Sequence, residues 1–245
     1  MKVIITMAGM GSRFTKIGIQ KPKHEIIAKS HTLFYWSMRS LIDFFDETFI
    51  FICRKGAYNE TFIKLECEQL GIHHFEIIAL DELTDGQATT TLFADKFIQK
   101  NDAVLIYNID TYIEEDQLKK NDIPVDGAGY LPAFDAVGDK WSFVQLKSED
   151  SLEVKAVSEK VRISNLGTIG LYYFNHWAIF KSILDKNKQD IIRDYKESYI
   201  APMYKYLIDQ GNKVYTSIIP TSKIHVLGTP EDVIAFDPEY INSNS

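Results

Sequence analysis

The chain has 245 residues, of which 45% are hydrophobic and 25% are charged, as is typical of a globular protein. It carries 27 Lys and Arg against 34 Asp and Glu, a net charge of −7, and no basic run longer than two residues. This balance argues against a nucleic-acid-binding surface and against binding to an anionic membrane, and it favours a small anionic ligand held by a local basic loop.

Strand and helix signals alternate through the first half of the chain, which predicts a parallel α/β sheet. We expect buried strands at residues 2–7, 49–53, 75–80 and 103–109. We expect helices at residues 58–70, 87–98 and 114–120, and one that starts after Thr32, a good N-cap.

After Asp126 the strand signals show polar alternation, which indicates a mixed or antiparallel extension of the sheet. The expected strands cover residues 127–134, 141–147, 152–158, 168–175 and 213–219, and two helices cover 176–185 and 200–210. A last short helix should begin with Thr229 as N-cap and Pro230 at its first position. Residues 242–245 read as a flexible tail.

The chain has two cysteines, Cys53 and Cys67, each within an apolar run. We expect reduced thiols rather than a disulfide, which points to the cytoplasm. No signal peptide and no apolar stretch near 20 residues is found, so no membrane association is expected.

The most informative stretch follows the first strand, where the sequence reads Ala8-Gly9-Met10-Gly11-Ser12-Arg13. Lys23 comes twelve positions after Gly11, within Lys21-Pro22-Lys23. Glycine lets backbone N–H groups approach an anion, and the nearby cations supply charge for phosphoryl transfer. A dinucleotide fingerprint would need glycine where Phe14 stands, and no Gly-Lys-Ser/Thr follows, so the two commoner phosphate loops are excluded.

This loop, together with Pro22-Lys23, resembles the signature of the nucleotidyltransferases that activate phosphorylated small molecules, chiefly sugar-1-phosphates, with a nucleoside triphosphate. The resemblance implies a Rossmann-like (GT-A-like) α/β fold with a central mixed, mostly parallel sheet flanked by helices. It also implies Mg²⁺ as cofactor. We expect a single domain over residues 1–241, with a nucleotide-binding half at about 1–125 and an acceptor-binding half at about 126–241.

The resemblance assigns roles by position. Arg13 would neutralise the leaving pyrophosphate, Lys23 would contact the α-phosphoryl group, and Asp110 would bind Mg²⁺. The implied nucleotide-binding residues are Ala8, Gly9, Gly11, Ser12, Gly86, Gln87, Ala88 and Asn108. The implied acceptor-side residues are His24, Glu159, Lys160 and Asn165.

The sequence departs from the family pattern at one position. A second metal-binding Asp usually stands two residues before the Gly of a late Gly-Thr-Pro-Glu segment, and here that position is Val226. Either the metal relies on Asp110 with phosphates and water, or His225 or Asp232 substitutes.

A finer resemblance rests on residues 7–14, 21–25 and 199–204. These are similar to the cytidylyltransferases that transfer CMP from CTP to phosphoglutamine during phosphoramidate modification of capsular polysaccharide. Three alternatives stay open: a hexose-1-phosphate nucleotidyltransferase, a non-catalytic nucleotide-binding relative, and a metal-dependent glycosyltransferase. The last would need an Asp-x-Asp pair where the chain has Asn108-Ile109-Asp110. The composition does not determine the oligomeric state, and a homo-oligomer is one of the possibilities.

Overall fold

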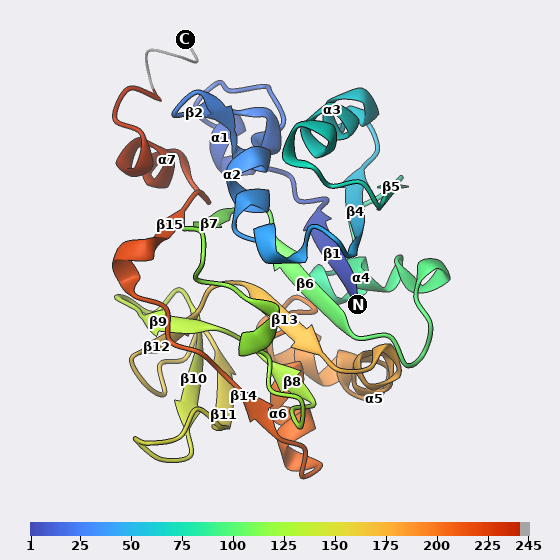
Figure 1. Ribbon diagram of the computed structural model, residues 1–245, viewed down its shortest axis with the longest axis vertical. Coiled ribbons are helices and arrows are strands. Elements are labelled where there is room, and N and C mark those ends of the chain that lie inside the picture. The colour runs from blue at the N-terminus through green and yellow to red at the C-terminus, as the bar shows by residue number, and fades with distance from the viewer. Residues whose placement is uncertain (241–245) are drawn as a thin grey trace. The chain divides into compact units, whose positions relative to one another are not determined.

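The computed structural model describes residues 1–240 (Figure 1). The chain forms two compact units, each assembled from segments far apart in the sequence. Unit 1 comprises Met1–Ile4, Thr84–Tyr107 and Lys120–Thr221, and unit 2 comprises Ile5–Leu83, Asn108–Lys119 and the described residues from Ser222 on. The expected halves that meet near residue 125 stay a prediction, and the expected tail at 242–245 lies outside the described residues.

Unit 1 holds most of the antiparallel strands and the longest helix. Its strands are β6 (Val104–Asn108, whose last residue belongs to unit 2), β8 (Gly129–Tyr130), β9 (Ala133–Asp135), β10 (Ser142–Leu146), β11 (Val154–Glu159), β12 (Leu166–Thr168), β13 (Leu171–Phe174) and β14 (Val214–Tyr215). Its helices are α4 (Gln87–Leu92), α5 (Trp177–Tyr195) and α6 (Met203–Asp209). Short 3₁₀ turns span Asp95–Phe97, Lys120–Asp122 and, at its boundary, Thr221–Lys223.

Unit 2 begins within the first strand and ends with the last helix. Its strands are β1 (Lys2–Met7, which starts in unit 1), β2 (Ile27–Ala28), β3 (His31–Thr32), β4 (Thr48–Arg54), β5 (Phe75–Leu80), β7 (Thr111–Ile113) and β15 (Ile224–Val226). Its helices are α1 (Ser12–Thr15), α2 (Leu33–Arg39), α3 (Glu60–Leu70) and α7 (Pro230–Phe236), and 3₁₀ turns span Lys23–Glu25 and Ile42–Phe44.

Hydrogen bonding joins seven strands in the order β14-β8-β13-β6-β1-β4-β5. The β4–β5 and β14–β8 pairs are parallel, whereas β13 runs antiparallel to both β6 and β8. A second sheet, β11-β10-β12-β9, is antiparallel throughout. The α/β class with a central mixed sheet and an antiparallel extension after Asp126 is therefore confirmed.

Local sequence signals explain several element boundaries. The Tyr35 N–H donates to the Thr32 Oγ1 at 3.0 Å, so Thr32 caps α2 as expected. Thr229 caps α7 in the same way, because its Oγ1 accepts from the Asp232 N–H at 3.1 Å while Pro230 occupies the first helical position. Strands β1, β4 and β5 match the expected strands to within one residue at each end.

The helix expected at residues 114–120 is wrong. The chain instead continues from β7 along β15, with which β7 pairs antiparallel, and the Glu114 N–H donates to the Lys223 carbonyl at 2.9 Å. Asp116 then takes a left-handed backbone conformation (φ 69°), which no helix allows. Figure 1 shows β7 and β15 side by side, with α7 following directly.

Other expected elements are shorter, longer or divided. The 127–134 strand is divided into β8 and β9, and the 168–175 strand into β12 and β13. Helix α4 ends at Leu92 instead of residue 98, and α5 continues to Tyr195. The two strands are divided because β8 pairs with β13 in one sheet while β9 pairs with β12 in the other, a long-range pairing that a local pattern does not contain.

The buried residues of both units are mostly apolar. In unit 2 one buried cluster joins Phe14 near the N-terminus to Leu227, Val233 and Phe236 from the C-terminal segment. Both cysteines are free and buried. In the part of the chain that is described, no helix combines the length and apolar character needed to cross a lipid bilayer.

Candidate functional site

The glycine-containing loop leaves β1 at the point where its buried run ends. Val3, Ile4 and Ile5 are fully buried, whereas Gly9 and Met10 are exposed. Gly11 then adopts φ 60°, a left-handed conformation that glycine takes without strain, and α1 starts at Ser12. A Cβ built on Gly11 would lie 3.7 Å from the Lys23 Cβ. The loop and Lys23, both predicted for the site, therefore lie close together.

Lys23 lies among charged groups from three other segments of unit 2. Its side chain is only 15% exposed, and its Nζ is 3.4 Å from the Asp110 Oδ2. Burial lowers the pKa of the Lys23 ammonium, the carboxylates of Asp110 and Asp232 oppose that shift, and the Arg13 guanidinium adds to it. The predicted residues Arg13, Lys23 and Asp110 thus share one electrostatic environment.

Asp232, on α7, belongs to the same environment. A Cβ built on Gly228 would lie 3.5 Å from the Asp232 Oδ2 and 3.7 Å from the Asp110 Oδ2, so both carboxylates approach one point. Glycine at position 228 leaves this space open. The backbone fixes the approach, because the Leu227 N–H donates to the Asp110 carbonyl at 2.8 Å.

His225, the other candidate substitute for the missing Asp, is engaged elsewhere in unit 2. Its Nε2 is 3.2 Å from the Glu114 Oε1, and its ring stacks on Tyr112 with 5.4 Å between centroids. Val226 pairs with Thr111 across the β7–β15 ladder. Of the alternatives to Val226, the geometry favours Asp232.

The donor set fits a magnesium ion bound together with phosphates. Within residues 1–240, no three His, Cys, Asp or Glu side chains gather in a way that could hold a metal by themselves. Mg²⁺, however, is commonly bound by one or two carboxylates, with substrate phosphates and water completing its octahedral shell. Asp110 and Asp232 supply such a pair.

His24, predicted on the acceptor side, is almost completely buried, at 4% exposure. Burial and the neighbouring Lys23 lower the pKa of His24 to about 4, so the ring is neutral at pH 7. Its ring centroid is 5.7 Å from that of Phe62. Its Nε2 is buried and finds no hydrogen-bond partner among the described residues. A role in acceptor binding stays a prediction.

The predicted base-recognition segment lies in unit 1, at the start of α4. Gly86 has φ 147°, and Gln87 and Ala88 open the helix. The Ala88 N–H donates to the Ser198 carbonyl at 2.8 Å. Ser198 and its neighbour Tyr199 were not predicted as site residues, because no local motif links residue 198 to residues 85–89.

Two predicted acceptor residues, Glu159 and Lys160, lie together in unit 1. Glu159 is 5% exposed, accepts a hydrogen bond from the Ser142 hydroxyl, and lies 3.6 Å from the Lys160 Nζ. Burial raises the pKa of the Glu159 carboxyl, although Ser142 and Lys160 partly oppose the shift. Asn165 is exposed, and its Oδ1 accepts from the Arg162 Nη1 at 3.3 Å.

Comparison with known structures identifies the family of this chain. The nucleoside-diphosphate-sugar pyrophosphorylase of Vibrio cholerae RC9 is 31% identical, with a TM-score of 0.87, over 96% of this chain and 99% of that one. This chain belongs to the same nucleotidyltransferase family. No model of a protein family matches the sequence, and no curated protein matches it either.

More distant structures share the nucleotidyltransferase fold. The inositol-1-phosphate CTP transferase of T. maritima is 15% identical, with a TM-score of 0.74, over 94% of this chain and 90% of that one. The UTP-bound UGPase of Acinetobacter baumannii is 14% identical, with a TM-score of 0.72, over 99% and 92%. The GT-A-like fold expected for the enzyme is therefore confirmed.

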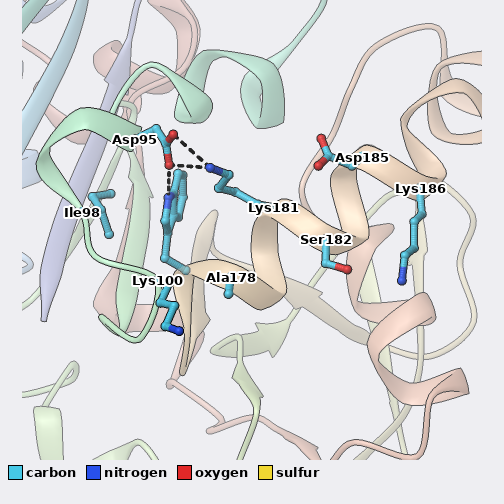
Figure 2. A pocket seen from close by; sticks show the side chains of 9 residues that line it. Asp95, Ile98, Lys100, Ala178, Lys181, Ser182, Asp185 and Lys186 are labelled. Carbon is cyan, nitrogen blue, oxygen red and sulfur yellow. Dashed lines mark hydrogen bonds and ion pairs between the residues drawn. The ribbon is translucent and has the colours of Figure 1, made fainter.

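The enzyme has two surface cavities among its described residues, and His225, one candidate for the second metal ligand, lines the one in unit 2. In unit 1 a cavity of about 520 Å³ borders α5, where the Trp177 indole and the Lys181 ammonium both donate to Asp95 (Figure 2). In unit 2 a cavity of about 450 Å³ is lined by aromatic rings that include Trp36 and Tyr112. Neither contains a predicted catalytic, nucleotide-binding or acceptor-binding residue, and the contacts to Asp95 tie α5 to the turn Asp95–Phe97.

Proposed function

We propose that this nucleotidyltransferase moves CMP from CTP to a phosphorylated small molecule, phosphoglutamine, and releases pyrophosphate, in phosphoramidate modification of capsular polysaccharide. The observation that carries nucleotidyl transfer is the grouping of Arg13, Lys23, Asp110 and Asp232 around the loop after β1. The choice of CTP and phosphoglutamine rests on the resemblance of residues 7–14, 21–25 and 199–204. A CTP transferase of the same fold supports cytidine as the base.

The reaction needs positioning and charge neutralisation more than covalent chemistry. An acceptor phosphate oxygen attacks the α-phosphorus, a new P–O bond forms, and the bond from that phosphorus to the bridging oxygen of pyrophosphate breaks. Lys23 holds the α-phosphoryl oxygens as charge accumulates there, and Arg13 binds the departing β,γ-phosphates. The backbone at Gly9, which is exposed, and at Gly11, which is half-buried, receives the triphosphate together with Ala8 and Ser12.

Asp110 and Asp232 would hold Mg²⁺. When bound, the ion adds positive charge at the phosphate oxygens. Because Lys23 lies against Asp110, the ammonium and the metal-binding carboxylate act on the same phosphoryl group. Asn108, at the end of β6, is proposed to contribute to nucleotide binding from the same segment as Asp110.

Unit 1 supplies the proposed specificity groups. Gly86, Gln87 and Ala88 contact the base, since the Gln amide offers both a donor and an acceptor to a base edge. Glu159, Lys160 and Asn165 bind the acceptor, to which Lys160 presents a cation suited to a phosphate or carboxylate. His24 is the proposed acceptor contact of unit 2.

A screen of pyrophosphate release tests the proposal. Each of the four nucleoside triphosphates is combined with phosphoglutamine and with common sugar-1-phosphates, and release is followed with Mg²⁺ present. Activity only with CTP and phosphoglutamine is expected. Turnover of a sugar-1-phosphate alone would refute the proposed acceptor while leaving the reaction class intact.

Two variants test the residue roles. Lys23→Ala and Arg13→Ala should each lower turnover by about 100-fold or more, as does the loss of a transition-state donor elsewhere. Lys21→Ala, which removes an exposed cation from the same segment, is the matched control and should keep wild-type turnover. Near-wild-type rates in both site variants would contradict the assignment.

A hexose-1-phosphate nucleotidyltransferase is the second candidate. It is favoured by the Vibrio cholerae relative, a nucleoside-diphosphate-sugar pyrophosphorylase that the chain matches over nearly its whole length. The mechanism at Arg13, Lys23 and Asp110 would be the same, so the acceptor arm of the screen separates the two candidates.

A further inference from the structure

Ser198 is fully buried and is bonded from both its backbone and its side chain to residues at the start of α4. The Ser198 N–H donates to the Asp85 carbonyl at 2.8 Å, and the Ser198 carbonyl accepts from the Ala88 N–H at 2.8 Å. The Ser198 hydroxyl donates to the Asp85 Oδ1 at 2.9 Å and lies 3.0 Å from the Thr89 Oγ1. Ser198 thus fixes both ends of the segment formed by residues 85–89 in unit 1. We call this segment the 85–89 turn.

Gly86 allows this close approach. A Cβ at position 86 would lie 2.5 Å from the Ser198 nitrogen and 2.9 Å from its carbonyl oxygen, which no side chain could occupy without moving the backbone. Gly86 also has φ 147°, which other residues rarely adopt. The shape of the 85–89 turn therefore depends on Ser198 directly, and Gln87 lies at its centre.

The next residue, Tyr199, is bonded to the lysine proposed for the acceptor. The Lys160 Nζ donates to the Tyr199 hydroxyl at 2.5 Å and lies 4.3 Å from the centroid of the same ring. Both contacts restrain a long side chain that is otherwise flexible and exposed. Lys160 also has a positive φ of 55°, a strained conformation for lysine.

We propose that Ser198 and Tyr199 form a strut that positions the 85–89 turn for the nucleotide base and Lys160 for the acceptor. The proposal rests on the proposed function, through the roles of Gln87 and Lys160. Both are positioning residues, since they act through the groups that contact substrate. The strut also has a direction: the bonds of Ser198 fix the backbone that carries Tyr199, whereas the Tyr199 hydroxyl contributes nothing to the 85–89 turn.

Two variants, assayed with the substrate pair that the wild type turns over best, test this direction. Ser198→Ala should raise KM for the nucleotide by about tenfold, the effect of losing a buried hydrogen bond, and should also raise KM for the acceptor. Tyr199→Phe should raise only the acceptor KM. Ser182→Ala and Tyr206→Phe, on α5 and α6 of the same unit, are the matched controls and should leave both KM values unchanged.

Hydrogen–deuterium exchange supplies a readout that needs no turnover. The amides of Ala88 and Thr89 should exchange faster in Ser198→Ala and at the wild-type rate in Tyr199→Phe. Asp85→Ala, at an exposed residue, removes the same hydroxyl contact without altering the interior, and should reproduce the faster exchange if Ser198→Ala does not fold.

The proposal is overturned if Ser198→Ala and Asp85→Ala leave exchange at residues 85–89 unchanged, or if both KM values stay within twofold of wild type. It is also overturned if Tyr199→Phe raises the nucleotide KM as much as the acceptor KM. Absence of turnover in the wild type with every substrate pair would instead refute the proposed function, and the exchange measurement would still test the strut.

Discussion

The Lys23 ammonium lies on a side chain that is largely shielded from solvent. A cation that has lost most of its hydration acts more strongly on a nearby phosphate than an exposed one does. The same burial lowers the pKa of Lys23, and the carboxylates of Asp110 and Asp232 make this shift smaller. The two carboxylates therefore have two proposed uses, since they oppose the lowering of the Lys23 pKa and would bind Mg²⁺.

Replacement of Asp232 tests the second of these uses. Asp232→Asn keeps the backbone N–H that Thr229 caps, but removes one of the two carboxylates that approach Gly228. We expect Mn²⁺, used as a spectroscopic substitute for Mg²⁺, to bind the enzyme–CTP complex on the order of tenfold more weakly. Electron paramagnetic resonance of free Mn²⁺ measures this, with Glu231→Gln, at the exposed neighbour, as control. Unchanged binding in Asp232→Asn would show that Asp232 is not a ligand.

His24 predicts how stability depends on pH. Its pKa is about 4 in the folded protein, against 6.5 as its usual value, so between these pH values the unfolded chain binds a proton that the folded chain does not. Stability should therefore fall as pH decreases from about 6.5 to 4, by on the order of 3 kcal/mol from this residue. Urea denaturation at several pH values measures the slope. His24→Gln should flatten it, and an equal slope in the variant would contradict the assignment.

The candidate site could be predicted from sequence where its residues form a local motif. Arg13 and Lys23 lie within one short stretch, and Asp110 follows a recognisable buried strand, so the sequence proposes all three, and the structure places them near one another. The choice between His225 and Asp232 needed the β7–β15 register and the position of α7. Ser198 could not be found, because its partners at residues 85–89 lie more than a hundred positions away.

At the scale of elements, continuous buried runs were predicted best. The strands β1, β4 and β5 were predicted because each carries a run of three or more apolar residues, Val3–Ile5, Phe49–Cys53 and Ile77–Leu80, that ends at a polar residue. The three-residue strands β7 and β15 were missed, since each is stabilised mainly by the other. Residues 114–120, expected to be helical, instead form a loop in which Glu115, Asp116 and Lys119 are exposed and Leu118 is buried.

The N-cap of α7 links one of these elements to the site. Thr229→Ala removes the side chain that accepts from the Asp232 N–H, and should lower the free energy of unfolding by about 1 kcal/mol. Fraying of the first turn also moves the Asp232 carboxylate, so Mn²⁺ affinity should fall together with stability. Urea denaturation and the Mn²⁺ titration measure the two effects. Ser222→Ala, at an exposed residue just before β15, should change neither.

At the scale of the whole molecule, the chain builds each unit from separated segments. Unit 2 takes its first strands and helices from the N-terminal third of the chain, β7 from the middle and β15 with α7 from the end. Its buried cluster depends on this arrangement, because Phe14 packs with Leu227, Val233 and Phe236. A nucleotide-binding half that ends near residue 125 would lack these C-terminal partners.

A fragment of residues 1–125 tests this dependence. Without residues 224–236 it loses the partner strand of β7 and a large part of the apolar cluster around Phe14, so we expect no cooperative unfolding transition and poor dispersion in its proton NMR spectrum. Addition of residues 126–245 should restore dispersion. The control is the full chain cleaved after folding next to Val125, whose side chain is fully exposed, and it should keep the native spectrum. A cooperative transition in the isolated fragment would show instead that the first 125 residues hold a sufficient core of their own, and that the C-terminal segment adds Asp232 to a domain already formed.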